Sequence, residues 1–165
     1  MLFRSQVPPS QIPRGGRGSP VETEVYLTMR WSSALPIRQA LLLDEYGAAA
    51  KIPPDKLAAL KQEPDHYLVE IFGLPAEVVQ MGREKMERAL LDSARITRSG
   101  KRTLSATEVH APEQGAYRSI SLLFPKTDPL TPDDKDAEVY AAAQPFEFRH
   151  KFPLKNMVYG GVLAL

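Results

Sequence analysis

The sequence contains no cysteine. Disulfide bonds, thiolate zinc sites, iron–sulfur clusters and a cysteine nucleophile are therefore excluded. Long apolar runs are also absent, because the run from Ala40 to Leu43 is far shorter than the roughly 20 residues that a membrane-spanning helix needs. A charge excess is missing too, since 21 basic and 20 acidic residues give a net charge of +1. This balance argues against a nucleic-acid partner, because such partners usually require a strong basic excess.

Several motifs of enzymes and cofactor-binding proteins are missing as well. A phosphate-binding loop has the motif Gly-x-x-x-x-Gly-Lys-Ser/Thr. Gly100-Lys101 matches its Gly-Lys pair, but Arg95 occupies the position of the first glycine. Neither a Gly-x-Ser-x-Gly turn nor a Gly-x-Gly-x-x-Gly dinucleotide motif occurs. No set of residues assigns an acid, a base and a nucleophile together. We therefore expect no cofactor, and the sequence favours a protein without enzymatic activity.

The composition is that of one globular domain with a tail. The chain has 165 residues, of which 43% are hydrophobic and 25% are charged. Residues 1–20 contain prolines, glycines and arginines but no acid, and they bury too little apolar surface to offset their ordering entropy. We predict a disordered basic tail over 1–20 and a single domain over 21–165. The first residues lack the apolar core of a signal peptide, which favours a cytoplasmic location.

Hydrophobic periodicity predicts an α+β fold. Alternation of apolar and polar residues indicates strands, expected over 25–31, 65–72, 103–111, 118–124, 138–143, 146–152 and 162–165. Helical spacing and prolines in first turns indicate helices, expected from Ser33 to Tyr46, over 54–60 and over 75–92. The first helix is expected to bury one face, formed by Ile37, Ala40, Leu41 and Leu43. We predict a largely antiparallel sheet of about six to eight strands, with two or three helices packed on one face.

The segment from Asp136 to Phe152 is central to this prediction. Its second half alternates without a break, so that one face is formed by Phe146, Phe148, His150 and Phe152. Gln144-Pro145 indicates a short hairpin loop before this strand. An aromatic face of this size needs a covering layer, and we expect the helices of the first half of the chain to supply it.

Four cations surround Ser99-Gly100 with no acid nearby: Arg95, Arg98, Lys101 and Arg102. This basic tip is a candidate anion-binding site, although a solvated turn is the simpler interpretation. The tail adds Arg14-Gly15-Gly16-Arg17-Gly18, which resembles a single RGG element. The two segments together suggest binding of an anionic polymer as one alternative function.

Histidines and carboxylates provide the candidate metal ligands: His110, His150, Asp133, Asp134 and Asp136. The histidines lie on different expected strands, so the fold has to bring them together. The acidic segment lacks the glycine and the spacing of a calcium loop, and prolines interrupt it. If the ligands converge, the protein is a small metal-assisted hydrolase that uses His110 or His150.

Three stretches resemble a group of small bacterial proteins with no assigned activity: Met29–Arg38, Leu122–Pro129 and Phe152–Tyr159. The resemblance implies no reaction. It does imply export, and so it favours a periplasmic or extracellular location. The leading functional hypothesis from the sequence is a non-catalytic binding or accessory protein with a protein partner, as a subunit of a larger assembly. The hydrolase and the anionic-polymer binder are the alternatives.

Overall fold

The computed structural model describes residues 3–6, 26–74, 82–111, 119–144 and 146–165. Strand pairing among these residues is antiparallel throughout. The first sheet contains, in spatial order, β1 (Phe3–Gln6), β2 (Tyr26–Trp31), β3 (His66–Phe72), β7 (Ser119–Pro125) and β6 (Glu108–His110). The second contains β5 (Leu104–Ser105), β4 (Arg95–Thr97), β8 (Asp136–Ala143) and β9 (Phe146–Pro153). A separate hairpin is formed by β10 (Val158–Tyr159) and β11 (Val162–Leu163).

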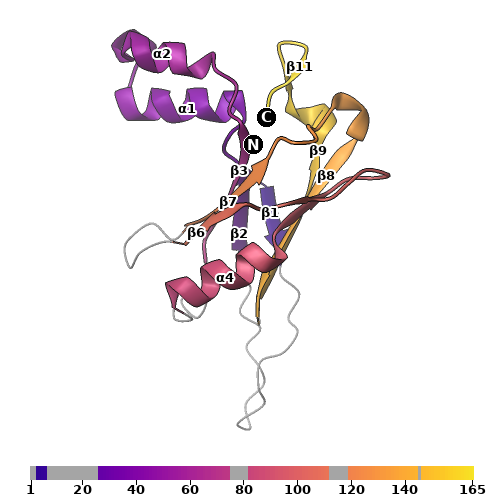
Figure 1. The fold of residues 1–165 in the computed structure, drawn as a ribbon. Coiled ribbons are helices and arrows are strands. Elements are labelled where there is room, and N and C mark those ends of the chain that lie inside the picture. Colours follow the sequence, from indigo (N-terminus) through magenta and orange to yellow (C-terminus); the bar gives the residue numbers. More distant parts are fainter. Residues whose placement is uncertain (1–2, 7–25, 75–81, 112–118, 145) are drawn as a thin grey trace.

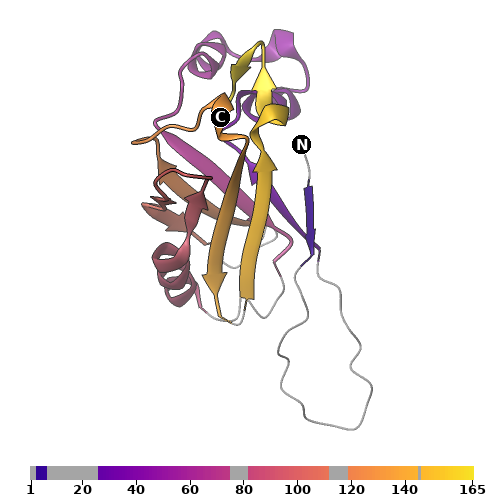
Figure 2. The same cartoon turned by 90° about the vertical axis from the view of Figure 1, so that its right-hand side faces the viewer.

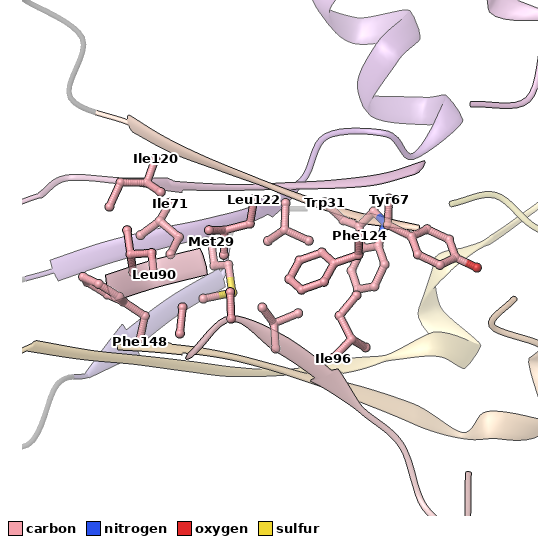
Figure 3. Close-up of a cluster of buried hydrophobic side chains, with 14 of the residues drawn as sticks. Met29, Trp31, Tyr67, Ile71, Leu90, Ile96, Ile120, Leu122, Phe124 and Phe148 are labelled. Carbon is pink, nitrogen blue, oxygen red and sulfur yellow. The ribbon is translucent and has the colours of Figure 1, made fainter. Parts of the chain in front are cut away.

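The two larger sheets face each other and enclose the core. In Figure 2, β8 and β9 of the second sheet lie in front of the strands of the first sheet. Side chains from both sheets and from one helix meet in a single buried cluster (Figure 3), which includes Met29, Trp31, Ile71, Leu90, Ile96, Ile120, Leu122, Phe124 and Phe148. Burial of each large side chain contributes about 1.5–3 kcal/mol relative to exposure, so this cluster is a major source of the fold's stability.

The aromatic face of β9 is buried, as the alternation predicts. Phe148 and Phe152 are each 2% exposed, and Phe146 and His150 are partly buried. The ring of Phe152 meets the ring of Trp31 edge-to-face, with 5.2 Å between the ring centres. Because Trp31 ends β2, the first sheet forms part of the layer that covers this face.

The predicted α+β class with antiparallel strands is confirmed. The described helices are α1 (Leu35–Tyr46), α2 (Pro54–Leu60) and α4 (Arg83–Ser93), with short 3₁₀ turns η1 (Ala49–Lys51), η2 (Pro132–Asp134) and η3 (Leu154–Met157). Helix α4 packs against β8 and β6 and buries Met86 and Leu90. Figure 1 shows α1 and α2 at the opposite end of the molecule from α4. The structure thus adds that the strands are divided between two facing sheets.

Helix α1 has the predicted ends but not the predicted buried face. Pro36 lies in its first turn, and the N–H of Gly47, at φ 72°, donates to the carbonyl of Leu43 at 2.8 Å. The predicted burial of Leu41 and Leu43 is wrong, because their exposed fractions are 43% and 44%. Ala40 is exposed as well. No residue of α1 is fully buried. Ile37, the remaining residue of the predicted face, is partly buried and packs against the core.

Some predicted segments lie partly outside the described residues. The predicted helix over 75–92 is described from residue 83 onward, and the predicted strand over 103–111 is divided into β5 and β6. Within the predicted tail, Phe3–Gln6 forms β1, while residues 1–2 and 7–20 lie outside the described part. The division into tail and domain therefore stays a prediction. Among the described helices, none is long and apolar enough to cross a membrane.

Candidate functional site

Arg98, at the centre of the predicted basic tip, is a buried structural cation. Its side chain is 0% exposed. The guanidinium donates to the backbone carbonyls of Asp128 at 2.9 Å and Pro129 at 3.0 Å, and it pairs with the carboxylates of Asp128 and Asp134. A buried cation with these partners holds the 128–134 loop against the end of β4 and presents no charge to a ligand.

Asp134 binds a second cation of the basic tip. Its carboxylate is 1% exposed and lies 2.7 Å from Nζ of Lys101. It also accepts hydrogen bonds from the amide of Thr131 at 2.7 Å and from the Thr131 hydroxyl at 3.1 Å. Burial raises the pKa of Asp134, but the bonds from Lys101 and Thr131 outweigh it, so that the pKa lies below its usual value. The ionised Asp134 therefore neutralises Lys101.

The other two cations of the tip have different surroundings. The guanidinium of Arg95 lies 4.0 Å from the centre of the Tyr140 ring and donates to the carbonyl of Ser93 at 3.3 Å. Arg102 is exposed and has no carboxylate partner within the described part of the chain. The four predicted anion-binding cations thus do not converge on one site, and among the described residues neither Arg95 nor Arg102 pairs with a carboxylate.

Arg102 lines an open hollow of about 400 Å³. Its walls come from residues 102–105 and from Pro125, Thr127 and Asp128, so three hydroxyl-bearing residues and one acid are among the lining residues. The Asp128 side chain is 45% exposed, although it also pairs with Arg98. One basic residue, one acidic residue and three hydroxyl-bearing residues thus line the hollow.

The predicted histidine ligands lie on different sheets. His110, on β6 of the first sheet, is 58% exposed at its side chain, and its Nε2 lies 3.4 Å from the carboxylate of Glu108. His150, on β9 of the second sheet, packs against Phe152 with 4.7 Å between the ring centres. Burial lowers the pKa of His150 below its ordinary value. Burial therefore favours the neutral form of this imidazole.

The predicted acidic ligands are also in separate environments. Asp134 is bound by Arg98 and Lys101, Asp136 pairs with Lys151 at 2.9 Å, and Asp133 is exposed. Across the described ranges, no three histidine or carboxylate side chains are grouped so as to hold a metal ion. The structure does not bring the five predicted metal ligands together.

One polar cluster was not found from the sequence. On β2 and β3, Nη2 of Arg30 lies 2.6 Å from the carboxylate of Glu70, and Nε donates to the hydroxyl of Ser32 at 3.0 Å. Ser32 in turn donates to Glu70, and Arg30 lies over the ring of Phe72. The cluster links the end of β2 to β3 through these side chains. Only the register, which pairs Arg30 with Glu70, reveals it.

A set of exposed apolar side chains was also missed. We call it the apolar end; it consists of Leu41 and Leu43 of α1, Leu57 of α2, Val158 and Tyr159 of β10, and Val162 of β11. Figure 1 shows α1, α2 and β11 at the end of the molecule away from α4. The amide of Leu35 donates to the carbonyl of Ala164 at 3.2 Å and so joins α1 to the chain after β11. The leucine run 41–43 is a sequence signal for this surface, but helical periodicity predicts that Leu41 and Leu43 are buried.

Comparison of the chain with protein-family models, with curated proteins and with solved structures gave no match. The resemblance to small bacterial proteins stays an expectation.

Proposed function

We propose that this protein is a non-catalytic binding protein that joins a larger assembly through its apolar end. The observation that supports the proposal is the exposure of large apolar side chains on four elements, α1, α2, β10 and β11, at the same end of the molecule. Leu41 and Leu43 are 43% and 44% exposed, Tyr159 is 48% exposed, and Val162 is 65% exposed. Grouped exposed apolar residues are typical of surfaces that another molecule covers, whereas scattered ones need no explanation.

The stability of α1 gives a second argument. The helix has 12 residues, and none of them is fully buried. Helices of this length are marginal in water, and most helices in proteins are stabilised by packing of an apolar face. Its own chain fixes α1 through the packing of Ile37 against the core and through bonds from Arg38 to the carbonyls of Ala59 and Gln62 at 2.7 and 3.0 Å. A partner that covers Leu41 and Leu43 supplies the packing that is missing.

The charges around the leucines indicate a protein partner. Exposed acids and exposed lysines both surround the leucines of α1 and α2: Asp44, Glu45, Lys51, Asp55 and Lys56. A rim with both signs of charge is typical of protein–protein interfaces. Membrane surfaces and nucleic acids instead attract surfaces with a basic excess. We therefore infer that the occupant is an apolar surface of another protein chain.

The test is the native mass of the protein in extracts of cells that produce it. We expect the wild-type chain to elute above its monomer mass of 18.3 kDa. The variant Leu41→Ser/Leu43→Ser should elute as a monomer, because two exposed apolar contacts are removed with little effect on folding. Leu91→Ser is the matched control, since Leu91 is 40% exposed but lies on α4, and it should elute like the wild type.

Two results would overturn the proposal. One is a wild-type chain that is monomeric both in extracts and after purification. The other is a variant of Leu41 and Leu43 that keeps the wild-type mass. If the purified chain alone forms the heavier species, the mass of that species shows that the occupant is a second copy of this chain.

The two alternative functions stay predictions with less support. A metal-assisted hydrolase requires grouped ligands, which the described residues do not provide. An anionic-polymer binder requires free cations at the basic tip, where Arg98 and Lys101 are bound by carboxylates.

A further inference from the structure

The hollow beside Arg102 is lined by one basic and one acidic residue that do not pair with each other. Arg102 and Asp128 both line it, yet no ion pair joins them in the described part of the chain. Asp128 is held in place because Arg98 binds its Oδ2 and its backbone carbonyl. The carboxylate is nevertheless 45% exposed, and no hydrogen bond to Oδ1 occurs among the described residues. Oδ1 is therefore available to accept a hydrogen bond from a ligand.

The hydroxyls that line the hollow are also available. Thr103, Ser105 and Thr127 make no side-chain hydrogen bonds to other described residues. Leu104, between two of them, is buried and pairs with Ile96 of β4, which positions the 102–105 wall. The opposite wall follows β7, whose pairing with β3 extends to Pro125. Both walls are therefore tied to the sheets, which limits the rearrangement that binding requires.

We propose that this hollow binds a small zwitterion of the amino-acid class. Arg102 binds the carboxylate, Asp128 accepts hydrogen bonds from the ammonium group, and the hydroxyls complete the contacts. A simple anion would leave Oδ1 of Asp128 without a donor, and a simple cation would leave Arg102 without an acceptor. A ligand with both charges satisfies both groups. The volume of about 400 Å³ lies within the usual range for small-molecule sites.

This inference does not depend on the apolar end, because it involves other residues. The hollow is open, so its charges remain exposed to water and salt, and exposed ion pairs are weak. We therefore expect dissociation constants of about 1 mM or above. The intact chain is titrated with L-alanine in low-salt buffer while the backbone amide resonances of 102–105 and 127–128 are followed by NMR.

Two matched probes separate the roles of the charges. Propionate lacks the ammonium group of L-alanine, and ethylamine lacks its carboxylate. We expect saturable shifts with L-alanine and about tenfold weaker binding of each probe, the size of effect that loss of one good polar contact gives. Arg102→Gln should weaken L-alanine binding about tenfold as well. Arg88→Gln, at an exposed position of α4, changes the net charge equally and should leave binding unchanged.

Three results would overturn the proposal. The first is the absence of saturable shifts with L-alanine in the folded wild type. The second is binding of propionate or ethylamine as tight as that of L-alanine, which would show that the charged group missing from that probe does not contribute to binding. The third is unchanged binding in Arg102→Gln. Arg102 is exposed, so this variant is expected to fold, and its amide spectrum will show whether it does.

Discussion

Replacement of Arg98 by alanine should be among the most destabilising single changes in this chain. The wild-type side chain is 0% exposed and binds two backbone carbonyls and two carboxylates. Removal of one partner from a buried ion pair typically costs about 3–5 kcal/mol, because the other charge is left uncompensated. Here Lys101 still binds Asp134, so we expect a loss of about 3–4 kcal/mol. That is a large part of the roughly 5–15 kcal/mol by which domains are stable.

The assay is urea unfolding followed by the fluorescence of Trp31. It is the only tryptophan of the chain and is 2% exposed, so its emission reports exposure of the core. Arg102→Ala is the internal control, because the same residue type at an exposed position should change stability by no more than about 0.5 kcal/mol. Arg98→Lys keeps the charge but loses the planar guanidinium, so an intermediate loss is expected. This second variant keeps the test decisive if Arg98→Ala does not fold. Equal stability of the two alanine variants would refute the structural role of Arg98.

Three further predictions test other parts of the structure. Burial lowers the pKa of His150 from its ordinary value of 6.5, so the unfolded chain binds a proton more readily than the folded chain does. The free energy of unfolding should therefore fall as the pH drops below about 6.5, by at most about 1.4 kcal/mol per pH unit. His150→Phe should reduce this slope in urea titrations at several pH values. The hydroxyl of Ser93 accepts from the amide of Ala142 at 2.8 Å, so Ser93→Ala should cost about 1–3 kcal/mol in the same assay. Leu90→Ala, at 0% exposure, should cost about 2–5 kcal/mol, whereas Leu43→Ser should cost about 0.5 kcal/mol or less.

Each of these predictions has a contradicting result, and those for His150 and Leu90 also have a control variant. His110→Gln removes an exposed histidine and should keep the pH slope; a slope unchanged in His150→Phe would contradict the role of His150. For Ser93, a stability within about 0.3 kcal/mol of the wild type would show that the bridge between α4 and β8 contributes nothing. Equal losses of stability in Leu90→Ala and Leu43→Ser would contradict the burial of Leu90 and the exposure of Leu43.

Local elements were predictable because their signals are local. The alternation from Phe146 to Phe152 places alternate residues of β9 on a buried face, and the structure confirms it. Pro54 marks the start of α2, where proline fits the first turn without loss of a hydrogen bond. Antiparallel pairing followed from hairpins such as β8–β9, whose strands are neighbours in the sequence.

Long-range partners could not be predicted from spacing alone. Arg98 and Asp134 are 36 residues apart, so nothing in the basic tip shows that a carboxylate from a distant loop binds it. Helical periodicity identified an apolar side of α1, but it does not say whether the chain itself covers that side. The exposure of Leu41 and Leu43 depends on where α1 and α2 lie relative to the sheets, and only the structure supplies that.

The most direct test of the proposed function is site-specific photo-crosslinking in cells that produce the protein. A photoreactive residue at Leu43 or at Val162 should give a crosslinked product with the same protein, because both positions belong to the apolar end. The same residue at Leu91 on α4 should give no such product. Absence of any product from Leu43 and Val162, or an identical product from Leu91, would contradict the claim that this end is where a partner binds.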